Sequence, residues 1–453
     1  MSNVSHNPQN LDTTIENKPS RWMRWAANLA NPRGRQNVLA IGDQAIISGT
    51  NFLTTIVVGR WCGPEGLGIF GLGLTLIFLL VATQESLITT PYTIFLARTD
   101  DSNKPTYRAN TLLSYLVMSA LCATVLLTAA VAMLMLGASQ QIAYVLAALA
   151  LACPCWLLRE FARRSAYAEF KIATSFGINV TVMVAQVVGL VCLARLDRLT
   201  PASGFLVVAI ANLIAGVAWV FTSRNSMKFS RGHFRTTLSK HWGLGKVMFV
   251  SQVIHAMSSL TLPWLIAFCL GTTATGVFVA CEQIIRLSNP LLVGLTNILT
   301  PRTAHTFAEE GRAGVHHIVK RAMILFAIPM ALFCGAIALC GDQILGRLFG
   351  DEYLGYSTVL IILVAAKAFD AVSIGPGRGL IVFERVNDCL RADVIKFCIT
   401  LTTTLILIWQ FDILGAAFGT LIGSIVFTTI LTGLYWKAAV LPAQLPVEAT
   451  QLG

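Results

Sequence analysis

The chain has 453 residues, of which 55% are hydrophobic and only 12% are charged. A soluble protein carries about 25% charged residues, so this composition excludes a globular protein with a water-facing surface. The 33 basic residues exceed the 22 acidic ones, which gives a net charge of +11. Because the basic residues gather in the breaks between long apolar runs, we expect their partners to be anionic lipid head groups and not nucleic acid.

Apolar stretches long enough to cross a bilayer core of about 30 Å recur along the chain. In chain order the expected spans are 37–59, 67–95, 111–136, 142–158, 172–194 and 204–221, then 245–270, 276–299, 323–345, 357–382, 394–408 and 414–435. The sequence therefore predicts an all-α polytopic membrane protein with about twelve transmembrane helices in two pseudo-symmetric six-helix bundles. Its expected parts are a polar and basic N-terminal segment 1–36, a first bundle 37–221, a basic connector 222–244, a second bundle 245–437 and a short tail 438–453.

One short segment occurs in both halves. Gly63-Pro-Glu-Gly-Leu-Gly-Ile-Phe70 is echoed by Gly271-Thr-Thr-Ala-Thr-Gly-Val-Phe278, and each copy lies between the first two spans of its half. A repeat at corresponding positions indicates two halves related by an axis along the membrane normal, with a cavity between them. We expect its glycines to permit a tight turn and a close approach of helices.

The charges of the loops predict the orientation. With a cytoplasmic N-terminus, the outer loops receive few basic residues, namely Arg60, Arg195, Arg198 and Arg347. The positive-inside rule then places both termini in the cytoplasm. The outer loops are too short for a catalytic domain, so we expect no enzyme. The eleven cysteines show no metal-ligand spacing, and we expect neither a metal site nor another cofactor.

Three segments of this chain resemble a known family. The first span contains Gly42-Asp-Gln-Ala-Ile-Ile-Ser-Gly-Thr-Asn-Phe52, the echo at Gly63 follows it, and Gln84-Glu-Ser-Leu-Ile-Thr-Thr-Pro-Tyr92 comes next. Together they resemble the opening of bacterial polysaccharide-biosynthesis membrane proteins. The run Leu158-Arg-Glu-Phe-Ala-Arg-Arg164 is similar to that family's connection between its fourth and fifth helices. The family belongs to the superfamily of MATE drug exporters and lipid-linked oligosaccharide flippases.

The resemblance implies a MATE-like fold, which is a V-shaped pair of bundles that works by alternating access. It also implies a flippase of the bacterial inner membrane that moves a polyprenyl-diphosphate-linked oligosaccharide to the outer leaflet, for polysaccharide or lipopolysaccharide biosynthesis. Its implied partners are membrane lipid, the lipid-linked oligosaccharide and other polysaccharide-assembly membrane proteins. The alternative is a MATE-type exporter of organic cations, and either transporter could be coupled to protons or sodium ions.

Ionisable residues inside the spans are the first candidates for substrate contact, because such residues are costly there unless they are paired or hydrated. Glu282 and Arg286 lie one turn apart in the eighth span. Arg286 could grip the diphosphate through its planar guanidinium, while Glu282 orients it or carries a coupling proton. Alternatively, the two residues form a self-neutralising pair that is buried for packing.

The first two spans carry two carboxylates. In the MATE branch an acidic residue of the first helix belongs to the cation-coupling site, which makes Asp43 a coupling candidate. The other interpretation is that Asp43 lies capped and solvated near the cytoplasmic end. Gln44 and Asn51 are candidate substrate contacts from the same helix. Glu85 lies deeper in the second span and is a coupling candidate or a partner for Arg286.

Two further groups complete the candidate site. Lys367 and Asp370 either line the cavity or neutralise each other, and Arg378 could receive a diphosphate near the cytoplasmic end. The glycines and the proline around Arg378 predict a broken or hinged helix. Arg159 begins a basic run that we expect to form a collar around the cavity mouth, and it is the substrate contact we favour there.

Overall fold

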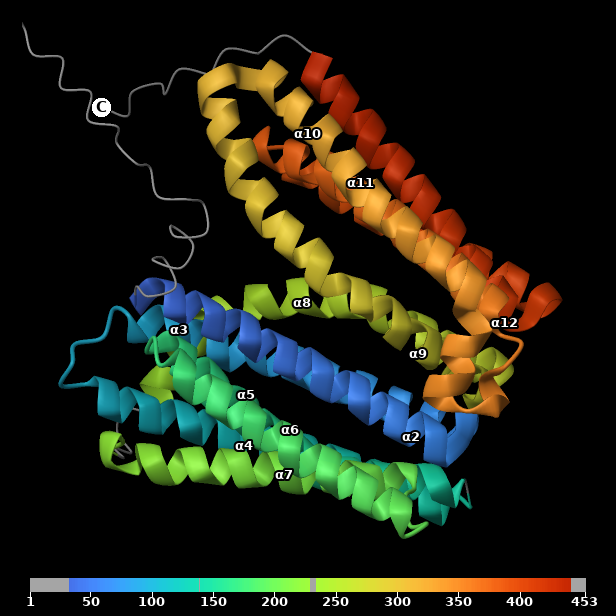
Figure 1. Ribbon diagram of the computed structural model, residues 1–453. Coiled ribbons are helices and arrows are strands. Elements are labelled where there is room, and N and C mark those ends of the chain that lie inside the picture. The colour runs from blue at the N-terminus through green and yellow to red at the C-terminus, as the bar shows by residue number, and fades with distance from the viewer. Residues whose placement is uncertain (1–31, 138, 229–233, 441–453) are drawn as a thin grey trace, which may run out of the picture.

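The computed structural model describes residues 32–137, 139–228 and 234–440. Most of the expected segments 1–36 and 438–453, and part of the connector 222–244, lie outside the described residues. Within these ranges the protein is helical and has no strand (Figure 1). The elements of the first half are α2 (Pro32–Gln84), η1 (Glu85–Thr89), α3 (Thr90–Leu96), α4 (Lys104–Met135), α5 (Gln140–Ala168), α6 (Ile172–Arg195), α7 (Pro201–Ser223) and η2 (Arg224–Ser226). Those of the second half are α8 (Phe234–Leu270), α9 (Thr272–Ile285), η4 (Arg286–Ser288), α10 (Asn289–Phe349), η5 (Asp351–Tyr353), α11 (Ser357–Val382) and α12 (Val386–Val440).

Several continuous helical segments contain two membrane crossings. The described chain has eight helical segments that are long and apolar enough to span a membrane. Three of them fold back on themselves, since α2 is interrupted at Gly63, α10 at Gly311 and α12 at Asp412. Together with α8, whose apolar part is 260–270, these segments make twelve crossings. The predicted number of spans is confirmed.

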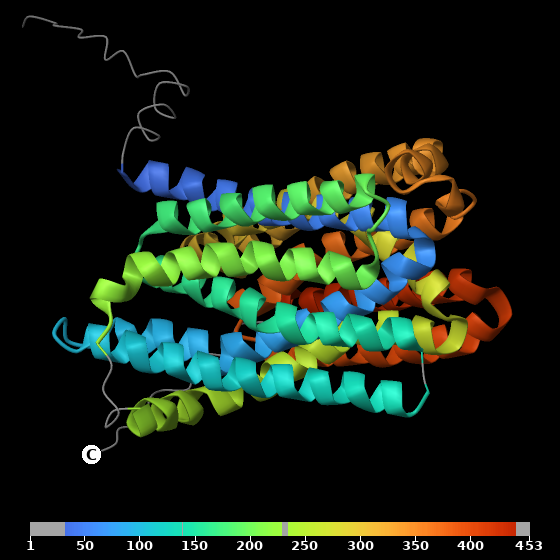
Figure 2. The same cartoon turned by 90° about the horizontal axis from the view of Figure 1, so that it is seen from below.

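The crossings form two bundles, as predicted. Helices α2 to α7 pack together in one, and α10, α11 and α12 form most of the other, with α8 and α9 between them (Figures 1 and 2). The first part of α8 packs on the first bundle, because a Cβ on Gly245 would lie 2.9 Å from the carbonyl oxygen of Ser86. The residue boundaries predicted for the bundles stay a prediction.

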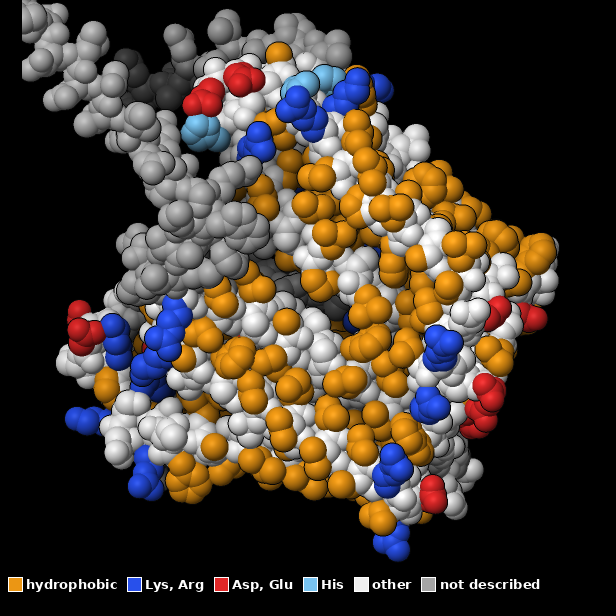
Figure 3. Space-filling view, in the orientation of Figure 1, with side chains coloured by type: hydrophobic (Ala, Val, Ile, Leu, Met, Phe, Trp, Pro, Cys, Tyr) orange, Lys and Arg blue, Asp and Glu red, His pale blue; other side chains and the backbone are white. Residues whose placement is uncertain are grey.

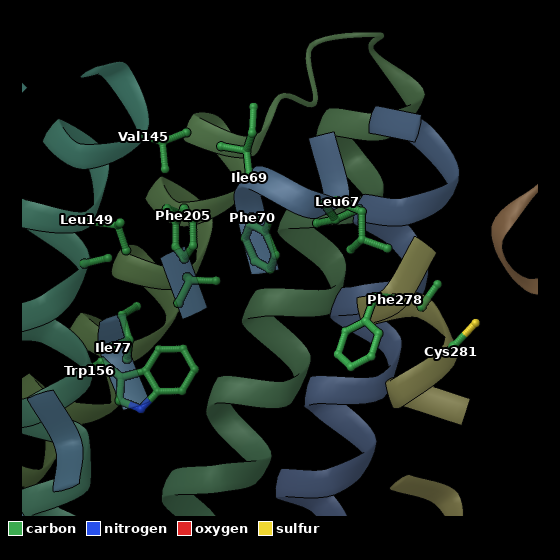
Figure 4. Packing of buried hydrophobic residues seen from close by; sticks show 14 of the residues in the cluster. Leu67, Ile69, Phe70, Ile77, Val145, Leu149, Trp156, Phe205, Phe278 and Cys281 are labelled. Carbon is green, nitrogen blue, oxygen red and sulfur yellow. The ribbon is translucent and has the colours of Figure 1, made fainter. Parts of the chain in front are cut away.

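The largest apolar cluster lies inside the first bundle and continues into α9 and α11. Phe70 of α2 stacks on Phe205 of α7 with ring centroids 4.3 Å apart, and Phe278 and Cys281 of α9 extend the cluster toward the second bundle (Figure 4). Large apolar side chains also cover the outside, for example Phe268 and Leu339, which are 89% and 84% exposed. A surface of this kind suits lipid, and Figure 3 shows it over both bundles.

The two copies of the echo adopt the same backbone conformation. Gly63 has φ 67° and ψ −177°, and Gly271 has φ 88° and ψ −178°. A side chain would strain both positions, so glycine is required at each turn. The two turns lie at one end of the molecule, which we call the closed end because the bundles meet there.

Candidate substrate pathway between the two bundles

The bundles touch at the closed end and part toward the opposite, open end. At the closed end the Arg60 Nη1 donates to the carbonyl oxygen of Arg347 at 2.7 Å, and the Tyr353 hydroxyl donates to that of Gly59 at 3.2 Å. Figure 3 shows that the surface is hollowed between the bundles. A substrate carried between two bundles would enter this hollow, so the position of each charged residue relative to it matters.

Two helices of the first bundle build a cluster of alternating charges. Four residues of the last turns of α5 lie close together because they are spaced at helical intervals: Arg159, Glu160, Arg163 and Arg164. The Glu160 carboxylate pairs with all three arginines, at 3.6 Å from Arg159 and 3.2 Å from Arg164. The Arg164 Nη2 also lies 2.6 Å from the Glu85 Oε1. The cluster therefore joins η1 to α5 and holds three cations against two carboxylates.

A π-helical turn places Glu85 in this cluster. Residues Glu85 to Thr89 form the wider turn, and Pro91 follows one residue later, after Thr90. The preceding Gln84 is fully buried and donates to the Leu157 carbonyl oxygen at 3.0 Å, which holds this part of the chain against α5. Turns of this kind are frequent at functional sites. Glu85 thus pairs with Arg164, and the pairing with Arg286 that the sequence suggested is wrong.

Asp43 is buried in a hydrogen-bond network of the same bundle. Its side chain is 1% exposed and accepts hydrogen bonds from the Asn179 amide at 2.6 Å, the Tyr167 hydroxyl at 2.9 Å and the Ser175 hydroxyl at 3.2 Å. Asn179 in turn accepts from the Arg159 Nη1 at 3.2 Å. Asp43 was expected to be capped and solvated. It is capped by side chains, but it is buried and not solvated.

Arg159 and Asn51 lie beside this network. The Arg159 Nε donates to the Asn212 Oδ1 at 3.0 Å, and Arg159, Asn51 and Asn179 line one small cavity. Arg159 itself is only 6% exposed. Two side-chain amides and Glu160 thus hold Arg159 inside the bundle. Gln44, by contrast, is exposed on the face of α2 that also carries Ser48.

The second bundle brings together a second group of charges from three helices. The Arg286 Nη2 lies 3.2 Å from the Glu282 Oε2 in α9 and η4, and the Lys396 Nζ of α12 lies 2.5 Å from the Asp370 Oδ1 of α11. The charges that act on the half-buried Lys367 are those of these four residues. We call the five residues the second-bundle charge cluster; it has three cations and two carboxylates.

Two expectations about α11 change. Asp370 does not neutralise Lys367, since its carboxylate pairs with Lys396, a residue that the sequence reasoning passed over. The signal for Lys396 was present, because it is a lysine inside an apolar run. The predicted helix break around Arg378 is also wrong, because α11 runs from Ser357 to Val382 through Pro376, while the alternative of a hinge there stays a prediction. Arg378 lies half-buried in its last turns, and no ion pair holds it among the described residues.

This arrangement, twelve crossings in two bundles around a hollow, is that of MATE-type membrane transporters. Two solved structures share it. One is an inward-facing multidrug-resistance MATE transporter of the MOP superfamily, with a TM-score of 0.69, 14% identity, and coverage of 86% of this chain and 94% of that one. The other is the lipid II flippase MurJ in an inward closed conformation, with a TM-score of 0.66, 11% identity, and coverage of 89% and 90%. At these identities the likeness establishes the fold, and the chain is a multi-pass membrane protein.

The chain is also similar in sequence to a curated protein. No protein-family model matches the chain. A curated relative, described as a probable low-salt glycan biosynthesis flippase, Agl15 of Haloferax volcanii, is 24% identical over 234 residues, which are 51% of this chain and 48% of the relative. The matched part thus spans about half the length of that relative.

Proposed function

We propose that the protein flips a polyprenyl-diphosphate-linked oligosaccharide across the cytoplasmic membrane by alternating access. Support comes from the similarity to a glycan biosynthesis flippase and from the shared fold of a lipid II flippase. In this proposal the substrate head enters the hollow from the open end, while its polyprenyl tail stays in lipid. The protein then acts as a transporter and catalyses no covalent reaction.

The observation that carries the proposal is the second-bundle charge cluster. Arg286 lies fifteen residues after the turn at Gly271, which corresponds to about 22 Å along a helix and hence to a position deep in the membrane. Its side chain is nevertheless 53% exposed. Because an arginine that faces hydrocarbon is costly, we infer that Arg286 faces the hollow.

The chemistry of the cluster suits a diphosphate. Only one of the three nitrogens of the Arg286 guanidinium contacts Glu282, so the other two are free to bind two phosphate oxygens. Lys367 adds a cation without an ion pair within 4 Å among the described residues. A drug-exporting site for organic cations would need a net negative cluster, and this one has an excess of one positive charge.

The remaining candidates act around this site in the proposal. Glu85, Glu282 and Asp370 are the groups that could carry a coupling proton, and Asp43 is a fourth with its hydrogen-bond network. Asn51, Gln44 and Arg378 would contact the head group as it enters, and the buried Arg159 would meet it only at the small cavity that it lines with Asn51. We further propose that both termini face the cytoplasm and that the basic connector 222–244 joins bundles at 37–221 and 245–437. Localisation in a bacterial inner membrane stays a prediction, because the relative is archaeal.

Reconstitution tests the proposal. The purified protein is placed in liposomes with a fluorescent polyprenyl-diphosphate-linked disaccharide, and an impermeant reductant reports how much label reaches the outer leaflet. We expect flipping by the natural protein, a loss of at least about tenfold in Arg286→Ala, and little change in Arg347→Ala, which removes an arginine at the closed end. If Arg286→Ala flipped the lipid at the natural rate, Arg286 would not belong to the substrate site. Transport of a cationic dye without any flipping would overturn the function and favour the drug-exporter alternative.

A further inference from the structure

The first bundle contains a second polar cavity, which is separate from the hollow between the bundles. It has a volume of about 170 Å³, and every residue that lines it belongs to the first half: Arg108, Ser165, Ala166, Glu169, Lys171, Thr174, Trp219, Thr222, Ser223 and Ser226. The cavity lies where α4 and α6 begin and where α5 and α7 end. These helix ends all belong to the open end of the molecule.

A buried arginine forms one wall of the cavity. Arg108 is 8% exposed, and its Nη1 donates to the carbonyl oxygen and the hydroxyl of Ser226, at 3.1 Å and 2.5 Å. Its Nη2 pairs with one oxygen of Glu169, while the Nε has no partner among the described residues. A buried donor without a partner is unusual, so Arg108 keeps hydrogen-bonding capacity beyond its contacts with Ser226 and Glu169.

The charges that line the cavity leave an excess of one cation. The second oxygen of Glu169 accepts from the Lys171 Nζ at 2.8 Å, so both oxygens of this carboxylate are already engaged. Lys171 keeps two further N–H donors, because an ammonium has three. The carboxylate therefore orients the two cations and does not compete strongly for a further one.

The start of α6 adds donors of a kind that anions prefer. Lys171 precedes the first residue of α6 and makes no side-chain cap. Its carbonyl oxygen accepts from the Thr174 N–H at 3.0 Å, while no hydrogen bond among the described residues engages the N–H groups of Ile172 and Ala173. The helix dipole favours negative charge at this position. Thr174 of the first turn and Ser223 of α7 also line the cavity, and neither hydroxyl has a hydrogen-bond partner in the described part of the chain.

We propose that this cavity binds a phosphate group, either that of an anionic phospholipid head group or a free phosphate ion. Arg108 and Lys171 supply the charge, and the Thr174 and Ser223 hydroxyls with the start of α6 supply hydrogen bonds. Because the ligand would contact the ends of four helices, its binding stabilises the first bundle by mass action. The site is independent of the flipping reaction and of the second-bundle charge cluster.

Thermal unfolding of the full chain in detergent micelles tests this site. In one arm the micelles contain phosphatidylglycerol or, as the control lipid, a diacylglycerol without phosphate. In the other arm inorganic phosphate is compared with chloride at the same ionic strength. We expect phosphatidylglycerol to raise the unfolding midpoint, and Lys171→Gln to raise the half-maximal lipid concentration about tenfold by removing a charged donor. Thr174→Val should act in the same direction without a change of charge.

The matched control is Lys104→Gln. Lys104 is a partly exposed lysine at the start of α4 that pairs with Asp101 at 2.6 Å and does not line the cavity. A response to the lipid alone supports the head group as the source, and a response in both arms supports recognition of phosphate itself. No response in either arm, or the same response in Lys171→Gln and Lys104→Gln, overturns the proposal. Because the measurement is stability, its failure would leave the proposed flipping untouched.

Discussion

Gly68 and Gly276, which hold the same place in the two copies of the echo, lie against each other where α2 crosses α9. A Cβ on Gly68 would lie 1.9 Å from the Thr272 carbonyl oxygen, and a Cβ on Gly276 would lie 1.8 Å from that of Pro64. A Cβ added to either glycine would therefore clash with the turn of the opposite copy in the same way. The pseudo-two-fold relation of the halves passes through this contact, and the backbones can meet there because neither residue has a side chain.

Enlarging either glycine should force α2 and α9 apart. We expect Gly68→Ala to lower the free energy of unfolding by about 1–3 kcal/mol, because backbone atoms cannot move aside as a flexible side chain does. The unfolding midpoint of the purified protein measures the change. Gly49→Ala in the same helix is the control, since no atom lies within 4 Å of its added Cβ. Equal midpoints for the two variants would show that the contact is not tight.

The network around Asp43 should be important for folding. Asp43→Asn keeps the size of the side chain but turns one acceptor toward Asn179 into a donor, so a buried donor loses its partner. We expect a loss of about 1–3 kcal/mol in the free energy of unfolding. Ser48→Ala, at an exposed position of the same helix, should be close to neutral. If Asp43→Asn were as stable as the natural protein, the network would not depend on the carboxylate.

The pair formed by Glu85 and Arg164 should stabilise the protein more than the pair formed by Glu282 and Arg286. Both pairs are partly exposed, with side-chain exposures of 30% and 37% in the first pair and 36% and 53% in the second. Solvent screens them, so we expect coupling energies of about 0.5–1 kcal/mol and about 0.3–0.5 kcal/mol. Double-mutant cycles on thermal unfolding measure both values. A larger coupling in the second pair would contradict the assigned difference in burial.

His241 should make stability depend on pH. It lies in α8 before the predicted span, it is 1% exposed, and its Nε2 lies 2.7 Å from the Tyr107 hydroxyl. Burial lowers the pKa of His241 to about 4, below its ordinary value of 6.5. As the pH falls from about 6.5 to about 4, the unfolded chain gains a proton that the folded one does not, so stability decreases over this window by about 3 kcal/mol in all.

Unfolding midpoints between pH 4 and pH 8 check this dependence. We expect a decline below about pH 6.5 in the natural protein and a shallower one in His241→Gln, which keeps a polar group beside Tyr107. His305, which is exposed and pairs with Glu309, provides the control variant His305→Gln with an unchanged slope. Identical slopes for the natural protein and His241→Gln would assign the dependence to other groups.

Much of the architecture could be read from the sequence, because the bilayer restricts what an apolar chain can do. Runs of about 20 apolar residues must cross as helices, since no water satisfies the backbone inside the membrane. Glycine at Gly63 and Gly271 marked both turns, because a positive φ favours that residue. Proline was a less reliable guide, because Pro376 left α11 continuous.

The pairing of the charged residues was decided by tertiary structure. Every face of a span is apolar, so the sequence pattern does not say which way a charge points. The sequence therefore could not predict that Glu85 pairs with Arg164 of α5 and not with Arg286. Nor could it predict that Asp370 pairs with Lys396 of α12. The sequence by itself determined a twelve-span protein of two repeated halves and the residues that could carry charge into the membrane. Only the packing of helices far apart in the chain decided which of those charges are partnered, since ion pairing depends on distances in space.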